Sequence, residues 1–563
     1  MLTKNKRQQN PLMDGIGDCN PQLFREIKGR FKGRNIAIAT AISALFQTFL
    51  YLTYEGSLPT AESRYYGGRY CLNFSSDRYK TCVEDAFGNL VNWQLWWLDI
   101  FIWMSIFAIF ALLIAGTYLL IADLAKEKNR GTLDFIRMSP QTATNILIGK
   151  ILGVPILIYF AVILALPLNL LAGLSAGIPL ILILAFYGVI VASCAFFYSA
   201  SLLLGLVDLG IGGFKIWLGS VLVFLFLWLM TAAIMSPYDN SGWGNPFDWL
   251  ALFHPGFALF YLVDATSLSS KVVRALNIQH LEELRWYGQS LWLNPWTGIG
   301  FLLFNYGACT YWIWQGVKRS FDNPIGTVFS KKQSYLICGI FSFILVGFTV
   351  YSEANRYSFE ANFVLLELLL VGLFLGLIGA ISPQRQTLQD WARYRHQNSN
   401  RRSLIEDLIW GEKSPSTLAI AFNILIAAIF VLPGAIISPL GKYKAAAFFG
   451  LIFLAATIII LAAIAQLILF AKTPRRVIFA SITVIALTIA PLAILGIFRI
   501  DPNDAPYLYF FTIIPMVGAE YATKVTVILS LLGQCLAIVG LNLQMTKQLK
   551  KAGESETKTL LSN

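Results

Sequence analysis

The stretch DLAKEKNRGTLDFIRMSPQTATNILIGK, residues 123–150, separates two long apolar segments at residues 96–121 and 151–174. It is rich in charged side chains, which are costly within the hydrocarbon of a bilayer. The stretch is therefore expected outside the membrane, between two segments that are long enough to cross it. Its many Lys and Arg residues predict the cytoplasmic side.

The centre of this stretch predicts a short helix that lies along the membrane surface. Leu133 and Ile136, with Phe135 beside them, form an apolar face at helical spacing. Ser139 and Pro140 have the order of an N-cap and a first helical residue, where the missing N–H of proline costs nothing. The residues leave two interpretations open: a charged loop that only orients the protein, or a docking element for a cytoplasmic partner.

The run EKNRGTLDFIRMSP followed by ILIGK resembles the signature loop of type-2 ATP-binding-cassette (ABC) permeases, and it lies between the second and third predicted spans, as in that family. There the loop forms the coupling helix that contacts the ATPase subunit. The resemblance, which includes Gly149 and Lys150, implies a bacterial permease with two six-span halves in one chain. It implies an exporter subunit powered by a separate cytoplasmic ABC ATPase. The ATPase-docking residues that it implies are Glu127, Arg130, Gly131, Thr132, Leu133, Ile136, Arg137, Ser139 and Pro140.

The composition is that of a protein embedded in a lipid bilayer. Hydrophobic residues make up 56% of the chain and charged residues 13%, whereas soluble domains carry roughly 25% charged residues. The net charge of +12 is explained by Lys and Arg in the loops between spans, so no nucleic-acid partner is expected. The first 34 residues are polar and basic and show no signal-peptide pattern, so we expect no cleavable signal peptide. Within them, NPQLFREIKGRFKGRN, beginning at residue 20, predicts a basic amphipathic helix in the membrane interface.

The apolar segments predict an all-α polytopic membrane protein with about 12 transmembrane helices. The expected spans are 36–54, 96–121, 151–174, 178–206, 216–235 and 295–315 in a first half, and 335–351, 363–381, 418–438, 445–470, 477–498 and 524–544 in a second. The expected domains are residues 1–34 (tail and interfacial helix), 35–322 (first six spans), 323–546 (second six spans) and 547–563 (tail). The basic loops predict a cell (inner) membrane protein with both termini in the cytoplasm.

The two halves look like a 6+6 parallel repeat. Ser-Pro dipeptides at 139–140 and 414–415 precede corresponding spans, which carry Pro167 and Pro433. Residues 245–265 form an apolar run that is broken by Pro255 and is too short to cross twice, so they predict an extracytoplasmic re-entrant segment. The second half lacks the Glu-x-x-Arg-Gly-Thr run, which leaves open whether it also contacts an ATPase.

Cys71 and Cys82 are the one cysteine pair in a predicted outer loop, and either a disulfide or two free thiols is expected there. The chain contains neither a GxxxxGK[ST] motif nor paired histidines. We therefore expect no catalytic residue, no metal site and no cofactor in this chain, with ATP hydrolysis on the partner. Asp99 and Glu367 lie near the outer ends of predicted spans and are expected to face water.

Two other classes remain as alternatives. A secondary active transporter often has the same 6+6 architecture, but its usual Asp-Arg/Lys-x-Gly-Arg loop motif is absent from EKNRGTLDF. A membrane-embedded enzyme would need carboxylates or histidines clustered at one membrane face, and the sequence does not suggest such a cluster.

Overall fold

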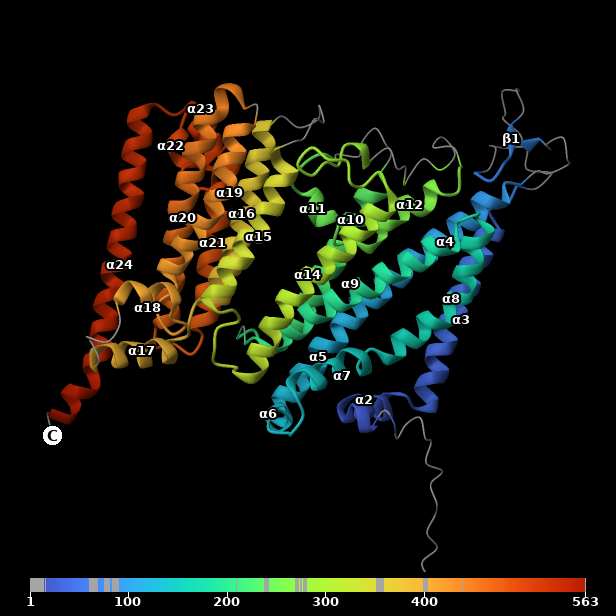
Figure 1. Ribbon diagram of the computed structural model, residues 1–563, viewed down its shortest axis with the longest axis horizontal. Coiled ribbons are helices and arrows are strands. Elements are labelled where there is room, and N and C mark those ends of the chain that lie inside the picture. The colour runs from blue at the N-terminus through green and yellow to red at the C-terminus, as the bar shows by residue number, and fades with distance from the viewer. Residues whose placement is uncertain are drawn as a thin grey trace, which may run out of the picture.

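The computed structural model describes residues 15, 17–59, 69–74, 82–83, 91–208, 210–236, 243–268, 273, 276, 281–350, 359–397, 403–438 and 440–561. These residues are helical apart from loops and two short strands, β1 (Asn73–Phe74) and β2 (Cys82–Val83) (Figure 1). Eleven helices of the described part are long and apolar enough to cross a membrane. The chain is thus a helical, multi-pass membrane protein, as the apolar periodicity of the sequence predicts.

The first five crossing segments follow the predicted spans closely. They are α3 (Gly33–Glu55), the continuous α4 (Trp93–Phe110), η1 (Ala111–Ala115) and α5 (Gly116–Asn129), then α8 (Ile156–Ser175), α9 (Leu180–Leu206) and α10 (Phe214–Ile234). The later six are α15 (Lys331–Val350), α16 (Phe359–Ile381), α19 (Thr417–Ile437), α20 (Lys444–Phe470), α21 (Arg476–Ile497) and α24 (Lys524–Leu561).

The sixth predicted span is the exception. The helix at its place, α14 (Pro295–Asp322), has 28 residues but is not among the eleven crossing candidates. Its Trp, Tyr, Gly and Asn residues lower its mean hydropathy. It nevertheless packs along most of α9, and Asn305 and Tyr306 are buried there. The sequence therefore predicts a helix here correctly. This helix is less apolar than the other predicted spans.

The remaining helices are short and lie at the two ends of the bundle. One end carries α2 (Pro21–Arg30), α6 (Thr132–Arg137), α7 (Ala143–Gly153), α17 (Arg385–Gln397) and α18 (Leu404–Trp410) (Figure 1). The other carries α11 (Asp248–Ala251), η3 (Pro255–Ala258), α12 (Leu259–Asp264), η5 (Gly441–Tyr443), α22 (Pro506–Tyr509) and α23 (Pro515–Tyr521). Helix α24 continues to Leu561, past the domain boundary expected at 546. Most of the expected N-terminal tail, residues 1–14 and 16, lies outside the described residues.

The predicted re-entrant segment forms three helices that are each too short to cross a membrane. Its polar backbone is buried within the protein, where side chains satisfy it. Asp248 accepts hydrogen bonds from the N–H groups of Gly244 and Asn245 at 2.7 and 3.0 Å. His254 Nδ1 accepts the N–H of Gly256 at 3.0 Å. Burial of Asp248 raises its pKa to about 8, although the two backbone N–H groups act against the shift.

Asp99 and Glu367 do not face water, contrary to the expectation from their positions in the sequence. Asp99 is 6% exposed and accepts hydrogen bonds from Arg69 at 2.6 and 2.9 Å and from the Tyr70 hydroxyl at 2.9 Å. Glu367 is 1% exposed, and its Oε2 accepts the N–H of Met516 at 3.4 Å. Both carboxylates are buried because they bind groups from distant parts of the chain. The sequence around each carboxylate does not reveal these partners.

A disulfide joins Cys71 to Cys82, whose Cα atoms are 5.5 Å apart, beside the β1–β2 pair. Cross-linking a loop of this length restricts the unfolded chain, and the expected contribution is about 3 kcal/mol. Replacing both cysteines with serine should therefore lower the thermal unfolding midpoint measured in detergent. The exposed free thiol Cys535 provides the control, since Cys535→Ser should leave the midpoint unchanged.

Candidate functional site

The polar stretch between the second and third spans folds into a bent arm at one end of the molecule (Figure 1). Helix α5 ends at Asn129, Gly131 turns the chain with a left-handed φ of 69°, and α6 follows at once. Glycine adopts this conformation without strain, whereas a side chain at this position would be strained. The Thr132 hydroxyl donates to the carbonyl of Glu127 at 3.2 Å and closes the turn. A short helix is therefore present where the sequence predicts one, at residues 132–137, and its position along the membrane surface stays a prediction.

One face of α6 is packed against the bundle. Leu133 and Ile136 are 3% and 7% exposed and belong to an apolar cluster with Leu124, Val317 and Phe321. The side chain of Arg137 lies over the ring of Phe321, with 5.5 Å between the guanidinium carbon and the ring centroid. Helices α5 and α14 thus hold α6 in a fixed position. Leu133 and Ile136 support the helix from below, and their role in docking stays a prediction.

The opposite face of α6 exposes two large apolar side chains. Phe135 is 79% exposed and Met138 83% exposed. Arg130, Gly131 and Asp134 are exposed nearby. This surface, which we call the α6 tip, consists of Arg130, Gly131, Thr132, Asp134, Phe135 and Met138. Apolar groups presented to solvent on a fixed support are typical of protein contact sites.

The restart after α6 differs from the predicted one. Ser139 and Pro140 lie in the turn, and α7 begins at Ala143 with Thr142 as its N-cap. The Thr142 hydroxyl accepts the N–H of Asn145 at 3.3 Å. Ser139 is therefore not an N-cap. Both residues carry capping side chains, and the sequence pattern did not show which one starts the helix.

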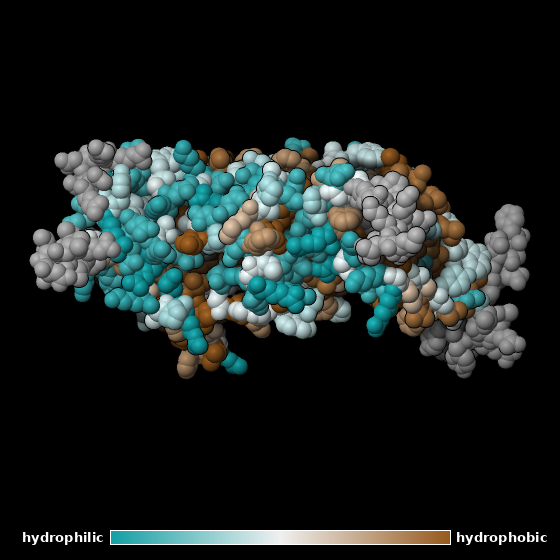
Figure 2. Space-filling view, turned by 90° about the horizontal axis from the view of Figure 1, so that it is seen from below, coloured by the Kyte–Doolittle hydropathy of each residue, from teal (hydrophilic) through white to brown (hydrophobic). Residues whose placement is uncertain are grey.

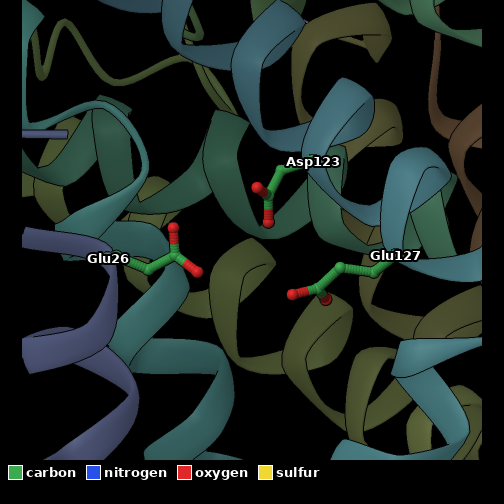
Figure 3. A group of neighbouring side chains, drawn as sticks. All are labelled: Glu26, Asp123 and Glu127. Atoms are coloured by element: carbon green, nitrogen blue, oxygen red, sulfur yellow. The ribbon is translucent and has the colours of Figure 1, made fainter. Parts of the chain in front are cut away.

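Charged side chains of α2, α5 and α7 form a cluster of alternating positive and negative groups. Figure 3 shows the three carboxylates, Glu26 on α2 and Asp123 and Glu127 on α5. Lys150 of α7 has no exposed side-chain surface, and its Nζ lies 2.7 Å from Asp123 Oδ2 and 2.7 Å from Glu127 Oε2. A buried ammonium group is tolerated only with such partners.

Two arginines of α2 complete this network. Arg25 Nη2 donates to Glu127 Oε1 at 2.6 Å. Arg30 donates to Asp123 Oδ1 at 2.6 Å and to Glu26 Oε2 at 3.1 Å. Burial alone would lower the pKa of Arg25, but the carboxylates of Glu127 and Glu26 outweigh this effect and raise it. We refer to Arg25, Glu26, Arg30, Asp123, Glu127 and Lys150 as the ion network.

The carboxylate oxygens of Glu26, Asp123 and Glu127 lie within 4.8 Å of one another, a spacing that would suit a metal ion. Each of the three carboxylates already has a cationic partner, however. The cluster is therefore an ion-pair network that ties three helices together. Glu127 lies inside this network and is 8% exposed. The docking role that the resemblance implies for it stays a prediction.

Helix α2 packs on α7 at very short range. A Cβ added at Gly149 would lie 2.7 Å from Asn20 Oδ1, and one at Gly153 would lie 2.5 Å from Glu26 Cβ. Asn20 caps α2 and donates to the carbonyl of Asn145 at 2.7 Å. Gln22 and Glu26 of α2 are buried, while the apolar Leu23, Phe24 and Ile27 are partly exposed, and the interfacial position of α2 stays a prediction.

Sequence reasoning placed Lys150 and Glu127 in the signature stretch but did not bring them together with Glu26 and Asp123. A local signal existed for one pair, because Asp123 and Glu127 are four residues apart and lie on the same face of α5. The partners on α2 are about a hundred residues away and carry no such signal. A scan of protein families, a search of curated proteins and a search of solved structures each found no match to this chain.

Proposed function

We propose that this chain is the membrane-spanning permease subunit of an ABC exporter, and that a separate ATPase docks at the α6 tip. The observation that carries the proposal is the combination of exposed Phe135 and Met138 with a firmly held base. A force that pushes on α6 would pass through α5, α7 and α14 into the crossing helices, because these helices pack against it or against each other. The resemblance of EKNRGTLDFIRMSP to the coupling loop of type-2 ABC permeases agrees with this role.

The packing of the helices supports a 6+6 repeat. In the first half α3 packs on α8, and α14 packs on α9; in the second half α15 packs on α19, and α24 packs on α20. The short helices before the last crossing are also alike, since η3 and α12 contact α9, and α23 contacts α20. We propose that ATP-driven closure of the partner rocks these two halves against each other.

The distribution of elements supports a topology with both termini in the cytoplasm. Helices α2, α6 and α17 and the end of α24 lie at one end of the bundle, and the disulfide-bonded loop lies at the other (Figure 1). Figure 2 views the first of these ends, where hydrophilic side chains gather. Lys and Arg residues on the cytoplasmic side and disulfides on the outer side are the usual arrangement in an inner membrane.

A secondary active transporter remains the second candidate, and Glu367 favours it. This carboxylate is 1% exposed within α16, and among the residues that the structure describes only one of its oxygens has a hydrogen bond, to the N–H of Met516. Intramembrane carboxylates often mark proton pathways. Asp99 does not add to this case, because Arg69 and Tyr70 hold both of its oxygens.

One purification separates the two candidates. The tagged chain is isolated from its native membranes in mild detergent, and the bound proteins are identified by mass spectrometry. A P-loop ATPase in stoichiometric amount is the expected result. Isolation without an ATPase, combined with transport that collapses when the proton gradient is dissipated, would instead establish the secondary transporter.

A further inference from the structure

An apolar groove lies between α4, α8 and α9, with α2 at its lower end, and has a volume of about 620 Å³. Leu23 and Ile27 of α2 form its floor. Ile163 of α8 and Val191 of α9 line it and are 58% and 69% exposed, so the groove opens on the side of the bundle rather than into its centre. This volume is within the range of ligand pockets, and leaving an apolar groove empty would forfeit dispersion contacts.

The polar groups in the wall of the groove are already paired within the protein. Asn169 donates to the Phe101 carbonyl and to the Ser105 hydroxyl, both at 3.2 Å, and accepts from the Tyr187 hydroxyl at 2.7 Å. Because these polar groups are already hydrogen-bonded, the wall offers mainly apolar surface to a ligand, which suits a hydrocarbon chain.

Two further tyrosines of the wall are also satisfied. Tyr159 donates to the Ile151 carbonyl at 2.9 Å, next to the break between α7 and α8. Tyr198 donates to the Leu112 carbonyl at 2.8 Å, within the π-helical turn η1. The same carbonyl also accepts the backbone N–H of Gly116, so the tyrosine hydroxyl is a second donor to it. The shape of the groove is thus set by buried hydrogen bonds.

The groove is long enough to cover one leaflet of a bilayer. Its wall on α8 runs from Ile156 to Asn169, which is about 20 Å at the rise of an α-helix. One leaflet contributes roughly half of the 30 Å hydrocarbon core. A chain that enters at α2 would therefore reach the middle of the bilayer and end near Asn169.

The segment that follows the floor residue Ile27 in the chain is basic. Lys28, Lys32 and Arg34 follow Ile27 and are exposed. Arg25 and Arg30 are neutralised in the ion network, whereas these three cations have no ion pair among the residues that the structure describes. Basic residues at the headgroup level attract anionic lipids.

We propose that the groove binds an acyl chain of an anionic phospholipid from the leaflet on the side of α2, with the phosphate at Lys28 and Lys32. The site does not depend on the exporter function, since it is built from the groove and the basic end of α2 alone. Neutral lipids would fit the hydrocarbon wall equally well, so the charge at α2 gives the selectivity.

The test measures lipid retained by the purified, delipidated full-length chain. Palmitoyl-oleoyl phosphatidylglycerol or the corresponding phosphatidylcholine is added back in detergent, and native mass spectrometry counts the lipids that remain bound. The wild type should retain the anionic lipid about tenfold more than the neutral one. Equal retention of the two lipids would overturn the proposal.

Variants assign the retained lipid to the groove. Ala195→Trp places a large ring inside it and should lower retention of the anionic lipid at least about tenfold. Ala41→Trp, at an exposed alanine of α3 outside the groove, should leave retention unchanged. Lys28→Gln with Lys32→Gln should reduce retention of the anionic lipid to that of the neutral one.

The outcome is decisive even if Ala195→Trp folds poorly, because Ile163→Trp fills the groove from α8 and serves as a second variant. Retention at the wild-type level in both Trp variants would refute the site. The assay contains no ATPase, so failure to retain the lipid would not contradict the exporter proposal. Conversely, lipid retention would not depend on whether the chain has an ATPase partner.

Discussion

Lys150→Met should lower the stability of the protein by about 3–5 kcal/mol, the cost of removing one partner from a buried ion pair. Lys150 is completely buried, and its ammonium group lies between Asp123 and Glu127. Without it, two carboxylates face each other in a partly buried site with only the arginines of α2 to balance them. Thermal unfolding in detergent, followed by intrinsic fluorescence, measures the loss.

The control for this variant is Lys128→Met in the same stretch. Lys128 pairs with Asp208 at 3.1 Å, but the two side chains are 40% and 65% exposed. Exposed pairs contribute roughly 0–1 kcal/mol, so this change should have little effect. Adding Asp123→Asn and Glu127→Gln to Lys150→Met should restore part of the loss, because neutral amides no longer repel. Equal destabilisation by the two lysine variants would contradict the ion network.

Phe135→Asp combined with Met138→Asp should strongly reduce co-purification of the proposed ATPase. Both side chains are largely exposed, so the protein should fold and unfold as the wild type does. Exposed apolar anchors at the centre of an interface are typically worth 2 kcal/mol or more each, so the bound partner should fall at least about 30-fold. Quantitative mass spectrometry of the purified complex measures the ratio.

Phe498→Asp is the matched control for these changes. Phe498 is 71% exposed and follows α21 at the opposite end of the bundle. It should not alter the amount of bound partner, although it introduces the same charge. If the α6 variant retains the wild-type amount of partner, the α6 tip is not a docking surface.

The sequence was most informative where a signal is local. Long apolar runs locate the eleven crossing helices because a bilayer requires about 20 apolar residues per helix. The helix at residues 132–137 follows from the spacing of Leu133 and Ile136, although these residues face the bundle and Phe135 faces solvent. Periodicity predicts which residues share a face, but it does not say what covers that face.

The sequence was least informative where partners are far apart in the chain. Arg25 and Glu127 are 102 residues apart, so nothing near Glu127 showed that it would be buried. The same reason explains the burial of Asp99 by Arg69 and of Glu367 by α23. For α2, hydrophobic patterning predicted a helix in the interface, but it did not predict the close contact with two glycines of α7 or the ion pair between Arg30 and Asp123.

We propose that a cytoplasmic protein binds the α6 tip. The most direct test places the photo-crosslinking amino acid benzoylphenylalanine at position 135 in living cells and identifies the cross-linked product by mass spectrometry. The account predicts one dominant product, a P-loop ATPase, which disappears when the same reporter is placed at position 498. Cross-links to lipid alone, or labelling of position 135 by a membrane-impermeant reagent from outside the cell, would contradict it.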